Sequence, residues 1–77
     1  MTATLLRQRI ARGEVEKAHL DRDFARQHME ILNALADRMP GAVSRQELLA
    51  ARRDAGKAYF DADQAEARLE LAMMENS

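Results

Sequence analysis

Small and apolar side chains recur at alternating steps of three and four residues through both halves of the chain. In the second half this stripe is Ala51, Ala55, Ala58, Ala62, Ala65, Leu69 and Ala72. In the first half it is Ala11, Val15, Ala18, Arg22, Ala25, Met29 and Leu32. Such spacing keeps one side chain per half-heptad on the same face of a helix. The pattern therefore predicts two long helices, each with a face of small residues that another helix can approach closely.

A single break separates the two patterns. Pro40 lacks an amide hydrogen and disfavours helical geometry in the residue before it, so the first helix should end just ahead of it. Gly41 accommodates the turn. Ser44 is followed three residues later by Glu47, which is the spacing of a capping box at a helix start. We expect a helix over residues 4–38, a turn over 39–44 and a helix over 45–74.

The two stripes match when the chain folds back at this turn. The members of each pair then lie equally far from the turn: Ala11 faces Ala72, Val15 faces Leu69, Ala18 faces Ala65, Ala25 faces Ala58, Met29 faces Ala55 and Leu32 faces Ala51. Arg22 would face Ala62, with its stem across the alanine and its guanidinium in solvent. The basic start of the first helix would lie beside the acidic end of the second. One register explains both stripes and predicts an all-α, antiparallel two-helix coiled-coil hairpin, a single unit over residues 1–77.

Large apolar residues remain outside the two stripes, and two helices cannot cover two strips each. An elongated apolar surface usually marks an interface. The simplest solution is self-association of two hairpins into a four-helix bundle, and a helix of another protein is the alternative. The residues expected at the interface are Leu20, Phe24, His28, Ile31, Leu35, Tyr59 and Phe60.

Candidate catalytic and metal-binding groups are few. Glu16 and His19 have the spacing that supplies ligands in di-iron bundles, and Glu66 would lie at the same height on the second helix. However, Glu16 and His19 share the most polar face of the first helix, whereas bundle ligands point inward. His28 lies on the apolar strip, where an interface role is more common than catalysis. Ser44 is accounted for by capping. We expect no enzyme activity, no metal site and no cofactor.

Composition narrows the possible partners and compartment. The formal net charge is -1, which favours neither nucleic acid nor an anionic membrane. The absence of cysteine excludes disulfides and thiolate chemistry. The sequence contains neither a signal-peptide pattern nor an apolar run of about 20 residues, the length that spans a membrane. We expect a cytoplasmic protein.

A basic cluster at the start of the second helix is the one nucleic-acid-like feature. It consists of Arg45, Arg52, Arg53 and Lys57. A Rop-like dimeric hairpin binds RNA across such a helical face. Here Glu47 and Asp54 interrupt the cluster, and it lacks interleaved aromatic residues for base stacking. A charged, solvated face is therefore the preferred interpretation, and nucleic acid is an unlikely partner.

The segment Gly41-Ala42-Val43-Ser44-Arg45-Gln46-Glu47-Leu48, with the Ala/Arg/Glu-rich helix that runs on to Ala72, resembles the α-helical hairpin of periplasmic adaptor (membrane fusion) proteins. In that family the hairpin tip meets an outer-membrane channel through an Arg and a Leu before the turn and a Ser after it. Ser44 matches the Ser and Leu35 the Leu. One helical turn before Leu35 stands Ile31, and one turn before Leu32 stands His28. The Arg of the family therefore has no counterpart here. The resemblance implies a periplasmic hairpin that contacts a channel protein.

These observations predict a non-catalytic protein–protein interaction module, a small adaptor, inhibitor or regulatory protein that acts through exposed helix faces. Two alternatives stay open. One is the hairpin of a periplasmic adaptor protein, cut from a longer chain and located in the periplasm. The other is a Rop-like RNA-binding hairpin.

Overall fold

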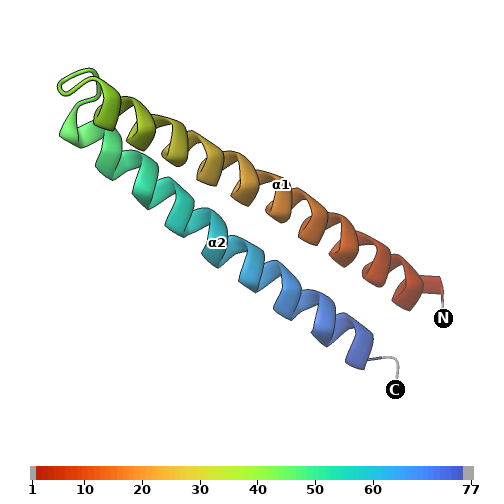
Figure 1. The fold of residues 1–77 in the computed structure, drawn as a ribbon. Helices are drawn as coiled ribbons and strands as arrows, with labels where there is room; N and C mark the ends of the chain where they lie inside the picture. Colours follow the sequence, from red (N-terminus) through yellow and green to blue (C-terminus); the bar gives the residue numbers. More distant parts are fainter. Residues whose placement is uncertain (1, 76–77) are drawn as a thin grey trace.

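The computed structural model describes residues 2–75 and consists of two antiparallel helices joined by a short turn (Figure 1). Helix α1 spans Thr2–Arg38 and helix α2 spans Arg45–Met74. They lie side by side, and the Cα trace measures 58 × 13 × 13 Å. The predicted all-α helical hairpin is confirmed. Helix α1 begins two residues earlier than predicted, because nothing between Thr2 and Thr4 opposes a helix.

The turn is built by backbone hydrogen bonds and one left-handed residue. The Met39 N–H donates to the Leu35 carbonyl oxygen at 2.9 Å, and the Ala42 N–H donates to the Met39 carbonyl oxygen at 2.9 Å. Gly41 has a φ of 90°, a conformation that glycine adopts without the steric penalty of a Cβ atom. Pro40 stands just before it, where the helix has already ended. These residues reverse the chain within one short loop.

Helix α2 starts at the predicted cap. Ser44 has an extended backbone, and its hydroxyl oxygen accepts a hydrogen bond from the Glu47 N–H at 3.0 Å. This bond satisfies one of the free amide groups of the first helical turn. Val43, just before the cap, is buried against the hairpin. The turn therefore fixes where α1 ends and where α2 begins.

The interface between the helices, called here the alanine seam, is made of the two predicted stripes. Its fully buried members are Ala11, Ala51, Ala55, Ala62 and Ala65. The other stripe residues, Arg22 included, are half-buried. Among the residues whose burial the structure describes, Val43 is the largest that is buried. A buried Leu or Phe contributes about 1.5–3 kcal/mol, so a seam of alanines supplies close contact but little hydrophobic free energy.

Cross-helix side-chain pairs report the register of the seam. They are Arg7 with Glu75 at 3.4 Å, Glu14 with Arg68 at 3.5 Å, and His19 with Glu66 at 2.6 Å. Each pair is centred on the turn, as the predicted register requires. All three are substantially exposed, and exposed ion pairs contribute only about 0–1 kcal/mol. Their main effect is on alignment rather than stability.

The two helices also repeat a stretch of sequence. Residues 11–25 and 51–65 align without gaps and share Ala11/Ala51, Arg12/Arg52, Lys17/Lys57, Ala18/Ala58, Asp21/Asp61, Asp23/Asp63 and Ala25/Ala65. The helices are antiparallel and their contacts are centred on the turn. The repeated stretches are therefore related by an approximate two-fold axis near Asp21 and Asp61. The two halves of the hairpin therefore place the shared alanine, lysine and aspartate side chains in equivalent positions.

Candidate protein-interaction surfaces

Helix α1 carries a row of exposed large apolar side chains on the side opposite the alanine seam. This outer strip of α1 consists of Leu6, Ile10, Leu20, Phe24 and Ile31. Each follows a half-buried seam-side residue by two positions, which is a rotation of about 200° around the helix. Leu20 and Phe24 are 71% and 73% exposed. Sequence reasoning missed Leu6 and Ile10, which the same two-residue offset would have found.

Helix α2 has a shorter outer strip with the same offset from the seam. It consists of Phe60, Leu71 and Met74, all exposed. Because the two seam faces meet in the middle of the hairpin, the two outer strips lie on its opposite edges. The predicted interface residues Leu20, Phe24 and Ile31 therefore lie together on one edge. Phe60 lies on the other and does not join them.

The remaining predicted interface residues sit closer to the seam. Leu35 and Tyr59 are 38% and 43% exposed, and His28 is exposed. The Tyr59 ring lies under the Arg22 guanidinium, with 5.8 Å from the guanidinium carbon to the ring centroid. A cation–π contact at a partly exposed site contributes about 0.5–1 kcal/mol. Tyr59 thus belongs partly to the contact between the helices rather than to a free surface.

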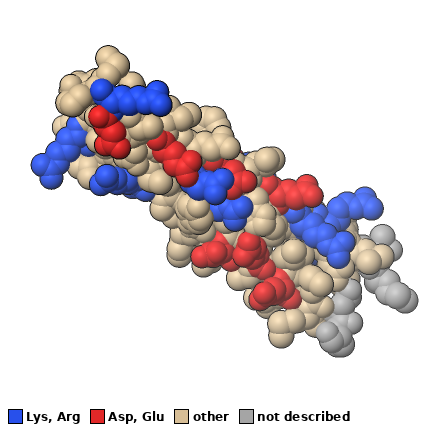
Figure 2. Space-filling view, in the orientation of Figure 1, with Lys and Arg blue, Asp and Glu red and all other residues tan. Residues whose placement is uncertain are grey.

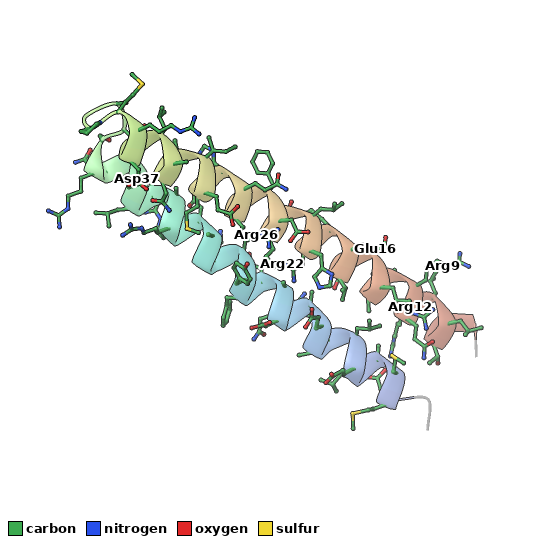
Figure 3. The ribbon with its side chains drawn as sticks, viewed as in Figure 1. Arg9, Arg12, Glu16, Arg22, Arg26 and Asp37 are labelled. Carbon is green, nitrogen blue, oxygen red and sulfur yellow. The ribbon has the colours of Figure 1, made fainter. Side chains whose placement is uncertain are left out.

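Arg22 is the one charged residue in the middle of the predicted stripe of α1. The Arg22 Nε donates to Asp23 Oδ1 at 3.1 Å, and the side chain is half-buried. Figure 3 shows Arg22 and Arg26 on the side of α1 that faces α2. The predicted exposure of the guanidinium is therefore only partial, because Asp23 and Tyr59 hold it beside the seam. Neither partner was foreseen, since neither lies on the stripe.

The two broad faces of the hairpin are charged. One face holds a groove of about 460 Å³ along the seam, lined by Glu14, Lys17, Ala18, Asp21, Asp54, Lys57, Ala58, Asp61, Ala65 and Arg68. Eight of these residues form four repeat-related pairs, such as Lys17 with Lys57. The face seen in Figure 2 carries side chains of both signs along both helices. The rows of large exposed apolar side chains lie along the edges, although Leu35, Tyr59 and Met73 are also partly exposed elsewhere.

The side chains of the metal-like pattern, Glu16, His19 and Glu66, do not point toward one common site. The His19 Nε2 atom lies 2.6 Å from Glu66 Oε1, whereas Glu16 lies on the side of α1 away from α2 (Figure 3). Residues 2–75 contain no group of three or more His, Cys, Asp or Glu side chains placed to hold a metal ion. The geometry offers a hydrogen bond between the helices: the sequence placed Glu66 at the height of His19, but the direct contact was not expected.

Part of the basic cluster at the start of α2 lies beside carboxylates. The Arg53 Nε atom lies 3.8 Å from Asp54 Oδ1, and Lys57 lines the groove between Asp54 and Asp61.

Neither helix in the described part of the chain is long and apolar enough to cross a membrane. The features that remain for recognition are the two outer strips and the tip.

The chain was compared with protein families, curated proteins and solved structures. No family model, no curated protein and no solved structure matches this chain.

Proposed function

We propose that the protein is a non-catalytic protein–protein interaction module, a small adaptor, inhibitor or regulatory protein that works through its outer strips. The observation that carries this proposal is the inversion of the usual burial pattern. Alanines fill the seam, while Leu20, Phe24 and Phe60 are left in water. An amphipathic helix of a globular protein normally turns its large apolar residues inward.

The free energy of burial supports the same proposal. The residues of the outer strip of α1 would each contribute about 1.5–3 kcal/mol if a partner covered them. A chain of 77 residues buries a small core and is often marginal without further contacts. Covering the strips therefore adds hydrophobic free energy that the seam lacks. Self-association, another protein, or both can provide the cover.

The test combines light scattering with capture of protein partners by the purified hairpin. The wild type is compared with Leu20→Ser/Phe24→Ser, which removes the centre of the α1 strip, and with Gln64→Ser/Ala67→Ser on the exposed side of α2. We expect the first variant to lose the assembly or the captured partner, and the second to keep it. A wild type that is monomeric at tens of micromolar and captures no protein would contradict the proposal.

The periplasmic adaptor hairpin remains a second proposal, supported by the tip. Ser44 follows the turn and Leu35 precedes it with part of its side chain exposed, as the resemblance requires. Its test is binding of the hairpin to purified outer-membrane channel proteins, with Ser44→Ala and Leu35→Ser as tip variants. Tight binding that both variants weaken would favour this proposal, and the absence of binding to any channel would refute it.

A further inference from the structure

We propose that the outer strip of α1 is a homodimer interface in which two hairpins pair antiparallel, α1 against α1, with the two-fold axis at Leu20. This inference rests on the proposed function and names its first partner, a second copy of the chain. It places four helices in a row, α2–α1–α1–α2, rather than around one common core. The outer strip of α2 and the tip stay free for other proteins.

The position of the axis follows from the length of α1. Leu20 is the midpoint of Thr2–Arg38, so an axis there lets the two α1 helices overlap along their whole length. In this register Leu20 meets Leu20 of the second copy, and Ile31 meets Ile10 of the second copy. An antiparallel pair centred on its most exposed leucine buries the full strip on both chains.

Gly13, Lys17 and Gln27 lie between the members of the strip on the same side of α1, and they are also complementary in this register. Phe24 meets Lys17 of the second copy, where an aliphatic stem and an ammonium group can cover the ring. Gln27 meets Gly13, which has open space around it: a Cβ atom added there would touch nothing within 4 Å. The long side chain therefore faces the residue that leaves the most room.

The neighbouring registers are worse. A shift of the axis by half a heptad toward the start of α1 places Lys17 against Lys17 of the second copy. A shift toward the turn places Lys17 against Ile31 and Leu20 against Gln27. Both bury a charge or an amide against an unsuitable partner, which is unfavourable. The register centred on Leu20 avoids these contacts.

The area available is sufficient for a specific dimer. Helix α1 has 37 residues, and at about 1.5 Å per residue and about 10 Å of width it presents roughly 550 Å². Two such strips bury roughly 1,100 Å², which is above the value of about 1,000 Å² expected of a specific interface. The broad faces offer no comparable apolar area, since charged side chains line them.

Charges along the margins of this interface do not drive association. Arg9 would face Glu30 of the second copy, which is favourable, while Glu16 would face Asp23 and Asp21 would face Asp21 beside the axis, which are both unfavourable. Exposed pairs of this kind contribute little in either direction. Association should therefore be driven by apolar burial, and added salt should leave it unchanged or strengthen it.

The experiment uses the absence of cysteine from the chain. Single-cysteine variants are oxidised under native conditions, and the rate of disulfide dimer formation is followed on a non-reducing gel. Leu20→Cys lies on the proposed axis. Phe60→Cys is the matched control, because it is the repeat-equivalent position on α2 and is also highly exposed. A mixture of Lys17→Cys and Phe24→Cys tests the register away from the axis.

We expect Leu20→Cys to cross-link about tenfold faster or more than Phe60→Cys, because a thiol pair held on the axis has a high effective concentration. The Lys17→Cys and Phe24→Cys mixture should give the mixed dimer in preference to either homodimer. Equal rates for Leu20→Cys and Phe60→Cys, or a faster Phe60→Cys, would overturn the inference. Circular dichroism of each reduced variant checks that it keeps the helical content of the wild type.

Light scattering separates failure of this inference from failure of the proposed function. A wild-type dimer of twice 8.7 kDa that does not cross-link through Leu20 overturns the α1 interface alone. A monomer that binds another protein through Leu20 and Phe24 also overturns the homodimer but leaves the interaction module standing. A monomer that binds no protein contradicts both.

Discussion

The two sides of α1 differ in size, burial and consequence. On the seam side, Ala11 is buried and the neighbouring stripe residues are half-buried, while on the outer side Leu20 and Phe24 are exposed. In most amphipathic helices the larger residues face inward. The contrast indicates that the two sides of α1 have different roles. The small side sets how closely α1 meets α2, and the large side leaves its apolar surface in water.

Placing a larger side chain in the seam tests whether close contact between the helices is required. This change should have the largest effect on the free energy of unfolding. Ala62 is 2% exposed, and Ala62→Leu adds three carbons where the helices touch. Overpacking of this kind costs about 1–3 kcal/mol, so the free energy of unfolding should fall by that amount. Urea unfolding followed by circular dichroism at one fixed protein concentration measures it. Ala67→Leu, the same change at an exposed position of α2, is the control and should stay within about 0.5 kcal/mol of the wild type.

Replacing the left-handed glycine tests how much the turn contributes to the stability of the hairpin beside the seam. A Cβ atom on Gly41 would meet nothing within 4 Å, but the φ of 90° is strained for any other residue. We expect Gly41→Ala to lower the free energy of unfolding by about 1–2 kcal/mol through the backbone alone. Thermal unfolding measures it. An unchanged melting temperature would mean that the turn adopts another conformation without loss.

Removing the helix cap sharpens the same point with a smaller change. Ser44→Ala deletes the oxygen that accepts the Glu47 N–H. Loss of an N-cap typically costs about 1 kcal/mol. Ser44→Asp should retain most of the stability, because Asp is an equally good cap. If both variants unfold at the same urea concentration as the wild type, the cap does not contribute to holding the hairpin.

The smallest expected effect is a gain, and it lies on the outer side. Gly56 is an exposed residue within α2, and an added Cβ atom meets nothing within 4 Å. Gly56→Ala should raise the free energy of unfolding by about 0.5–1 kcal/mol, because alanine loses less conformational freedom in a helix. Urea unfolding measures it beside Ala62→Leu. A loss of stability at Gly56 would show that the outer side of α2 is not free.

The helix boundaries and the seam could be predicted from the sequence because both depend on local rules. Pro40, Gly41 and Ser44 define the turn through backbone sterics and capping. The step of three and four then assigns a face to every residue on either side. The end of α1 at Arg38 and both ends of α2 followed from these rules. The start of α1 lacks such a signal, and the structure begins that helix two residues sooner.

The surfaces were harder to predict, because they depend on which side of each helix a residue takes relative to the other helix. Phe24 and Phe60 look alike in the sequence, but they lie on opposite edges once the seam is in place. Tyr59 differs from Phe60 by one position, yet it reaches Arg22 at the margin of the seam. The contact of His19 with Glu66 needs the side-chain orientation of both helices. None of these follows from the periodicity of one helix alone.

A seam of nearly identical side chains does not distinguish one register of the two helices from another. If the helices slid past one another by seven residues, Ala18 would face Ala58 and Ala25 would face Ala51, and the fit would be almost as good. The alanines therefore encode the spacing between the helices but hardly any information about their relative position along the axis. That information comes mainly from the short loop over residues 39–44, where Gly41 and Ser44 fix the end of α1 and the start of α2, and the cross-helix side-chain pairs add to it.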